Sequence, residues 1–282
     1  MEQDNFKSVS EIKSKVVSVD NTESKKEPTV ITMTDGVLIP KKSNKHLVTS
    51  WRLTFFGALI LLISLCIFKK DTYWKIFIYV ITGLPTTFEC TIFAIFGAIL
   101  IGIATGLGSS SKNRVINQIC GVYVELIRGI PLLVQLMFLY YALGALIHID
   151  GIVAAIVALS ICFGAYMGEI IRAGIQSIPK GQTEAARALG LSKSQTFFSI
   201  ILPQTIKVVL PAIGNEFISM LKDSSLVSIL ALSDILKRGR EYISRTFLSL
   251  QTMLVVALIY LILTLVLSRL VGLMEERLHK NG

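Results

Sequence analysis

The sequence predicts an all-α integral membrane protein with about six transmembrane helices. Its 282 residues are 52% hydrophobic and 17% charged, whereas ordinary soluble domains are roughly 25% charged. The mean hydropathy is +0.66. Apolar runs of near-spanning length recur along the chain, with polar or basic residues between them. This composition excludes an ordinary soluble domain.

Residues 1–50 are predicted to be a cytoplasmic, mostly disordered tail. Residues 1–52 hold nine Lys or Arg and seven Asp or Glu, with few aromatic residues and no sustained period. Such a segment buries too little apolar surface to offset the entropy of ordering. It is also too long and too acidic for the n-region of a cleaved signal peptide. The apolar run that follows is therefore expected to be retained.

Residues 51–75 are predicted to form an additional N-terminal transmembrane anchor and an outer loop. The run Leu53–Phe68 has 16 uncharged residues. At about 1.5 Å per residue it barely matches a hydrocarbon core of roughly 30 Å. Trp51, Arg52 and Lys69 are therefore expected to anchor its two ends.

Five further spans are expected in residues 76–282. They are Pro85–Leu107, Val122–Leu146, Ile152–Ile171, Ile200–Met220 and Leu248–Leu273. Six spans place both termini on one side. The distribution of Lys and Arg near the span ends favours an N-in/C-in orientation, although a basic cluster at Lys222 and residues 237–245 then lies outside.

Metal, redox and nucleic-acid chemistry are not predicted. The four cysteines lie in apolar runs without C-x-x-C spacing, and the three histidines lack metal-site companions. The basic residues lie at span ends, whereas a nucleic-acid-binding protein gathers them on one face. The chain has no nucleotide-binding motif. No catalytic residue, metal or bound cofactor is expected.

Two Gly-x-x-x-Gly pairs occur within the spans, at Gly102 with Gly106 and at Gly164 with Gly168. This spacing lets helix backbones approach closely in lipid. It favours tight packing within one bundle, and a dimer seam is the alternative.

The segment between the fourth and fifth spans has the pattern of a short, sharply bounded helix. Pro179 and Gly181 break the preceding helix. Thr183 is expected to cap an Ala-rich helix, and Gly190 suits the left-handed conformation that ends it.

A second helix is expected directly after this corner, because Ser192 and Gln195 match the S-x-x-Q capping box. The small residues Ala185 and Ala186 are expected on the surface of the first helix, where a partner's groove could approach closely. The alternative is a plain connector between two spans.

This segment resembles the EAA loop of ABC-importer permeases. The family pattern is Glu-Ala-Ala, three residues, Gly, nine residues, Ile, one residue and Leu-Pro. The matching positions here are Glu184, Ala185, Ala186, Gly190, Ile200, Leu202 and Pro203. The resemblance implies that these residues couple the chain to an ATPase.

The flanking stretches are similar to those of the polar amino-acid permeases of histidine/glutamine type. They are Tyr166–Gln182, Glu125–Leu133, Leu210–Glu216 and Leu221–Leu226. The resemblance covers roughly residues 76–280. This sequence departs from the pattern at Ser224, where Thr is more usual, at Glu89, and in the basic residues Arg238 and Arg240.

The resemblance implies the type I ABC-importer permease fold, with a five-helix core plus one N-terminal helix. Residues 76–282 would form the permease domain, with the coupling loop at residues 178–203. The implied partners are ABC ATPase subunits that bind the ATP, an extracytoplasmic amino-acid-binding protein and a second permease subunit, identical or different, in the membrane lipid. The chain itself would be a transport subunit of the bacterial inner membrane and no enzyme.

Ionisable residues in a bilayer are costly and are functional candidates. Glu169 with Arg172 and Glu125 with Arg128 have the i, i+3 spacing of pairs on one helical face. The first pair favours a structural role. The second leaves structure and gating open, because Pro131 suggests a kink close to it.

A second polar group lies at the outer half of the fifth span. It comprises Asn215, Glu216, Lys222, Asp223, Ser224 and Ser225. An amino-acid zwitterion needs donors for its carboxylate and an acceptor for its ammonium, and this group offers both. Substrate contact, gating or contact with the binding protein, and an ion pair between Lys222 and Asp223 are all open.

The mechanical expectation is that the coupling helix moves as a rigid lever. Pro203 and Pro211 are expected to kink the fifth span and to convert that motion into gate opening. The alternative function is an ion-gradient-driven secondary transporter with Glu89 or Glu216 as proton carrier, although the chain lacks the internal repeat typical of that class.

Overall fold

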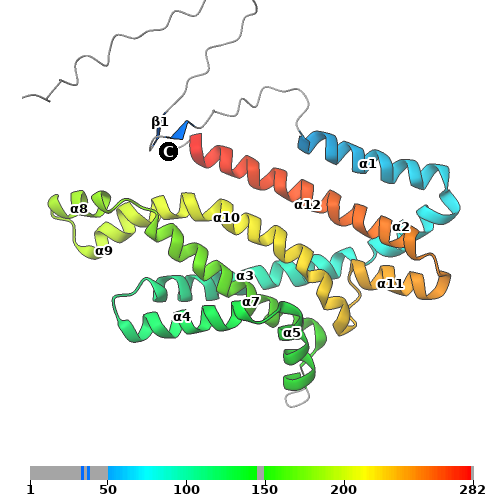
Figure 1. Ribbon diagram of the computed structural model, residues 1–282, viewed down its shortest axis with the longest axis horizontal. Helices are drawn as coiled ribbons and strands as arrows, with labels where there is room; N and C mark the ends of the chain where they lie inside the picture. Colours follow the sequence, from blue (N-terminus) through cyan, green and yellow to red (C-terminus); the bar gives the residue numbers. More distant parts are fainter. Residues whose placement is uncertain (1–32, 35–36, 39–49, 145–148, 281–282) are drawn as a thin grey trace, which may run out of the picture. The chain divides into compact units, whose positions relative to one another are not determined.

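The computed structural model describes residues 33–34, 37–38, 50–144 and 149–280 (Figure 1). The chain divides into two units, residues 1–49 and residues 50–282. In the first unit, β1 (Met33–Thr34) and β2 (Val37–Leu38) form an antiparallel pair. The rest of the predicted tail lies outside the described residues.

The described part of the second unit is built from helices. Its first half contains α1 (Ser50–Phe68), η2 (Lys70–Trp74), α2 (Lys75–Ile81), α3 (Leu84–Ser109), α4 (Arg114–Gly129), α5 (Leu132–Met137) and η3 (Phe138–Leu143). Its second half contains α7 (Gly151–Gln176), α8 (Lys180–Ala188), α9 (Lys193–Thr196), η4 (Phe197–Ile201), α10 (Leu202–Asp223), η5 (Ser224–Leu230), α11 (Ile235–Thr246) and α12 (Ser249–Lys280).

In the described chain, five helical segments are long and apolar enough to cross a membrane, and a bent pair makes a sixth if it counts as one span. This confirms the prediction of about six spans. The outer loop expected after α1 is instead mostly helical, because η2 and α2 lead directly toward α3.

The third predicted span is not a continuous helix, so the expectation for Val122–Leu146 is wrong in this respect. Helices α4 and α5 meet at 98°. Pro131 lacks an N–H group and restricts the residue before it to extended backbone, and Ile130 has ψ 129°. The Gln135 side chain donates to the carbonyls of Ile127 and Ile130, each at 2.8 Å. The expected kink at Pro131 is therefore confirmed, and it is a sharp corner.

Helices α3 and α7 form the centre of the bundle and pack through their glycines. A Cβ added to Gly164 would lie 2.7 Å from the Ile101 side chain, and one added to Gly106 would lie 2.8 Å from the Gly168 carbonyl oxygen. A Cβ at Gly102 would collide with Met167. The two Gly-x-x-x-Gly pairs therefore serve packing within one bundle.

A second core joins α1, α2, α11 and α12. Ile76, Val80, Ile235 and Val255 are fully buried in it. The indole N–H of Trp51 donates to the Leu265 carbonyl at 2.9 Å, which ties α1 to α12. The predicted N-terminal anchor is thus packed against the last helix.

Candidate functional site

The predicted short helix is α8, and its beginning differs from the expectation. It begins at Lys180, three residues before Thr183, so the prediction that Thr183 caps it is wrong. Pro179 occupies the N-cap position with φ −56° and ψ 134°, and no side chain caps the helix there. The fixed φ of proline suits a helix start, which explains why Gly181 lies inside the helix.

The end of α8 has the predicted glycine corner. Gly190 has φ +85°, a conformation that side-chain-bearing residues seldom adopt. The N–H of Leu191 donates to the Ala186 carbonyl at 3.1 Å, and the N–H of Gly190 donates to the Arg187 carbonyl at 3.0 Å. These two bonds are the Schellman motif. The helix therefore stops abruptly.

The surface of α8 is partly apolar. Glu184 and Ala185 are exposed as expected, whereas Ala186 is buried. Leu189 is 81% exposed. Sequence reasoning missed Leu189, although a leucine directly before a helix-ending glycine in a polar loop could have indicated a contact residue. An exposed Leu beside Ala185 suits a partner surface.

The second helix begins as predicted. The Ser192 hydroxyl accepts from the Gln195 N–H at 3.3 Å, and the Gln195 side chain accepts from the Ser192 N–H at 2.9 Å. This capping box is confirmed. It fixes α9 directly behind the Gly190 corner.

The last three positions of the pattern lie where α9 leads into the long helix α10. Ile200 lies in the π-helical segment η4, and Leu202 is the first residue of α10. Lys193–Leu230 is one continuous helical segment. Pro203 lies inside it, directly after the π-helical turn η4, and Pro211 lies within α10 as expected.

The two predicted ion pairs have different outcomes. The Arg172 Nε donates to Glu169 Oε2 at 3.0 Å, and a second contact joins Arg172 Nη2 to Glu169 Oε1. Glu125 and Arg128 do not pair among the described residues. Arg128 instead lies over the ring of Tyr166, 5.1 Å from its centroid, because it is near the end of α4 and faces α7.

The polar residues at the end of α10 are partly brought together. The charges of Asp223 and Arg128 both act on Glu216, with opposite effects. Asp223 and Lys222 are both exposed, and they form no ion pair within 4 Å in the described structure. Arg128, Glu216 and Asp223 thus combine one cation with two acceptors, contributed by α4 and α10.

The other members of this group are placed separately. Asn215 is exposed. Ser224 is buried, and its hydroxyl donates to the Leu221 carbonyl at 2.8 Å. This bond explains a hydroxyl at that position, and Ser225 is half-buried beside it.

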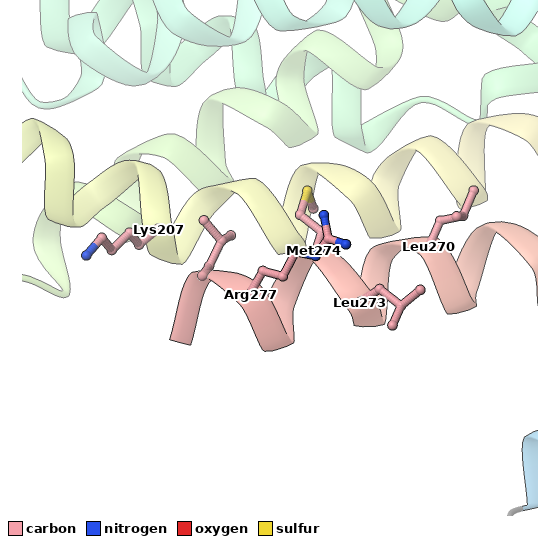
Figure 2. A pocket seen from close by; sticks show the side chains of 6 residues that line it. Lys207, Leu270, Leu273, Met274 and Arg277 are labelled. Atoms are coloured by element: carbon pink, nitrogen blue, oxygen red, sulfur yellow. The ribbon is translucent and has the colours of Figure 1, made fainter. Parts of the chain in front are cut away.

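A cavity of about 370 Å³ lies between α10 and α12. Figure 2 shows Lys207 of α10 and Arg277 of α12 at this cavity, together with apolar side chains of α12. Lys207 lies in the second turn of α10, and Arg277 lies in the last turn of α12.

Comparison with known proteins identifies the family. Residues 98–280 match the model of the "binding-protein-dependent transport system inner membrane component". The chain is 36% identical over 214 residues to the glutamine transport system permease protein GlnP of Escherichia coli K12, covering 75% of this chain and 98% of that protein. It is 38% identical over 200 residues to the probable glutamine ABC transporter permease protein GlnM of Bacillus subtilis, covering 71% and 93%.

A solved structure supports the same assignment. The crystal structure of an amino acid ABC transporter with histidines has a chain that is 38% identical to this one, with a TM-score of 0.69 and coverage of 74% of this chain and 97% of that chain. The fold, the α8 corner and these matches agree. The chain belongs to the binding-protein-dependent transport system inner membrane components, and it is a multi-pass permease subunit of an ABC importer in the inner membrane.

Proposed function

We propose that the chain translocates polar amino acids and that α8 docks it to an ATP-hydrolysing subunit. The observation that carries this proposal is the construction of α8 as a short helix with an exposed Leu189 and a closed Schellman end at Gly190. A rigid stub transmits a displacement that a flexible loop would absorb. ATP would be bound by the ATPase subunit, and the chain itself would bind no cofactor.

The proposed substrate site comprises Arg128 near the end of α4 and Glu216 and Asp223 toward the end of α10. The guanidinium of Arg128 would attract the carboxylate of an amino acid, and Glu216 and Asp223 would accept from its ammonium group. Glu125 is left out of this set because it forms no ion pair with Arg128 in the described structure. The names of the relatives GlnP and GlnM favour glutamine as the first substrate to test.

We propose a structural role for the Glu169–Arg172 pair, since both partners satisfy each other on α7. The expected partners are two ATPase subunits, a second permease subunit and an extracytoplasmic amino-acid-binding protein. The chain is inserted in the membrane with both termini and α8 on the cytoplasmic side.

Reconstitution tests the proposal. The chain is placed in proteoliposomes with its ATPase and its binding protein, and uptake of radiolabelled glutamine and arginine is measured with ATP on the α8 side. Uptake should require ATP and both partners. A proton or sodium gradient should drive no uptake into vesicles that contain the chain alone. Gradient-driven uptake by the chain alone would overturn the proposal.

A further inference from the structure

A basic cavity lies at the end of the bundle where α3, α7, α8 and α9 meet. Its volume is about 620 Å³. Four cationic side chains line it, namely Lys112, Lys180, Arg187 and Lys193. Hydroxyl groups lie beside them, including those of Ser109 and Thr183. No Asp or Glu is among the described residues that line the cavity.

The positive charge of this cavity is not neutralised within the described structure. None of the four cations forms an ion pair within 4 Å there. Glu184 belongs to the same helix as Lys180 and Arg187, but it does not line the cavity. Like charges that share a concave surface repel each other, so an anion bound among them would relieve this repulsion.

An apolar groove adjoins the basic cavity. The groove has a volume of about 380 Å³ and runs along α3, α7 and α10. Ile175 and Phe197 line both spaces, so the two lie next to each other. Thr205 is the one polar residue that lines the groove, and its hydroxyl is satisfied by the Ile201 carbonyl at 2.9 Å. A cationic cavity therefore lies beside an apolar groove between the membrane-spanning helices.

We propose that an anionic phospholipid binds here, with its phosphate among the four cations and an acyl chain in the groove. Basic pockets between helices at the cytoplasmic side of a membrane suit such headgroups. A free phosphate would occupy the cavity and leave the groove unused. A zwitterionic lipid would bring its ammonium group toward four cations. The combination of both spaces therefore selects a lipid with net negative charge.

The bound lipid would connect three separate segments. Lys112 follows α3, Lys180 and Arg187 belong to α8, and Lys193 begins α9. A phosphate contacted by all three would hold α8 against the end of the bundle. The cytoplasmic position of the cavity rests on the proposed function, whereas binding itself can be measured without transport.

Native mass spectrometry of the full chain in detergent tests lipid binding, with dioleoyl phosphatidylglycerol as the probe. Dioleoyl phosphatidylcholine, dibutyryl phosphatidylglycerol and inorganic phosphate are the comparison ligands. The dioleoyl phosphatidylglycerol complex should dominate over both other lipids, and inorganic phosphate at equal concentration should not displace it. Equal binding of the short-chain lipid, or displacement by phosphate, would mean a soluble-anion site and would overturn the proposal.

The double variant Lys112→Gln, Lys193→Gln removes two of the four cations without touching α8. It should weaken phosphatidylglycerol binding about 30-fold, since each cation near a lipid phosphate contributes about one factor of five to ten. The matched control Lys69→Gln, Arg240→Gln removes two exposed cations elsewhere and should leave binding unchanged. Equal loss in both double variants would overturn the proposal.

The same measurement is repeated on the chain bound to its ATPase. Phosphatidylglycerol should remain bound in that complex. If the ATPase excludes the lipid, the cations belong to the protein interface and the lipid site is refuted. Because these readouts need no uptake, they can fail while the transport function holds, and the reverse also applies.

Discussion

The N–H of Leu191 donates to the carbonyl of Ala186 at 3.1 Å and closes α8. This bond requires Gly190 between them to keep φ +85°. The coupling helix therefore has a fixed end and a defined direction toward α9.

Replacing Gly190 with valine should uncouple transport from ATP hydrolysis. A β-branched residue in the left-handed conformation costs about 1–2 kcal/mol, so the corner should rearrange and α8 should lose its orientation. ATP-driven uptake and substrate-stimulated ATPase activity are measured in proteoliposomes. Gly181→Val is the matched control, since both glycines have open space around the Cβ position but only Gly190 has positive φ. If Gly190→Val kept its substrate-stimulated ATPase activity, the proposal that α8 transmits motion as a rigid helix would be wrong.

The exposed Leu189 should contribute to docking the ATPase. Leu189→Ser removes an apolar side chain that is 81% exposed and should weaken ATPase binding by about tenfold or more, since interface truncations of this kind cost about 1–2 kcal/mol. Co-purification and titration of the ATPase onto the chain measure the effect. Leu53→Ser, at another exposed leucine far along the chain, serves as the control. A normal ATPase affinity for Leu189→Ser would exclude this contact.

Neutralising the proposed substrate site should impair uptake without disrupting assembly. Arg128→Gln and Glu216→Gln should each lower the rate of glutamine uptake by about tenfold or more, because a charge-assisted hydrogen bond contributes roughly 1.5–3 kcal/mol. Glu89→Gln changes an exposed glutamate on α3 and should leave uptake unaffected. Unchanged uptake in both site variants would exclude them from substrate contact. Loss of uptake only in Glu89→Gln would point back to the proton-carrier alternative.

Asp234 should make the stability of the protein depend on pH. It is fully buried, and it caps α11 by accepting from the N–H groups of Leu236 at 3.1 Å and Lys237 at 2.9 Å. The hydroxyl of Tyr260 donates to it at 3.5 Å. Burial raises the pKa of Asp234 from 3.8 to about 6, although these hydrogen bonds oppose the shift.

The sign of this dependence follows from the raised pKa. Proton binding favours the folded state, so the contribution of Asp234 is complete below the ordinary pKa and is lost as the pH rises through about 6. Asp234→Asn keeps an N-cap residue and should abolish this component in thermal unfolding between about pH 4 and 6. Asp150→Asn, at the exposed N-cap of α7, should leave the profile parallel to that of the unchanged protein. If the unfolding temperature of Asp234→Asn depended on pH in the same way as that of the unchanged protein, Asp234 would not be the source of this pH dependence.

Gly102 should tolerate no side chain. A valine there would collide with Met167 of α7 and should lower the free energy of unfolding by about 2 kcal/mol or more, as overpacked cores do. The unfolding temperature in detergent measures this. Gly121→Val is the control, because nothing lies within 4 Å of its Cβ position. Equal unfolding temperatures for the two variants would show that α3 and α7 can separate.

The local features were the most predictable from sequence. The capping box at Ser192, the left-handed Gly190 and the kink at Pro131 follow from the chemistry of one or two residues, and all three are confirmed. The predicted start of α8 at Thr183 was wrong because Pro179 at the N-cap position can begin a helix without a side-chain cap.

Features that depend on several segments were less predictable. Glu125 and Arg128 have the same spacing as Glu169 and Arg172, yet only the second pair forms. Arg128 lies over the ring of Tyr166, which belongs to another helix, and does not pair with Glu125. The spacing of residues within one helix does not predict such a contact. The effect of the Arg128 charge on Glu216 likewise joins two helices, α4 and α10, that are far apart in the sequence.

The glycine contacts between α3 and α7 also limit how a transport cycle can proceed. With no space for one extra methyl group at Gly102, Gly106 or Gly164, these two helices cannot slide or rotate past each other without breaking the bundle. They must travel as one block. Opening and closing then fall to the parts that surround this block, above all the 98° bend between α4 and α5.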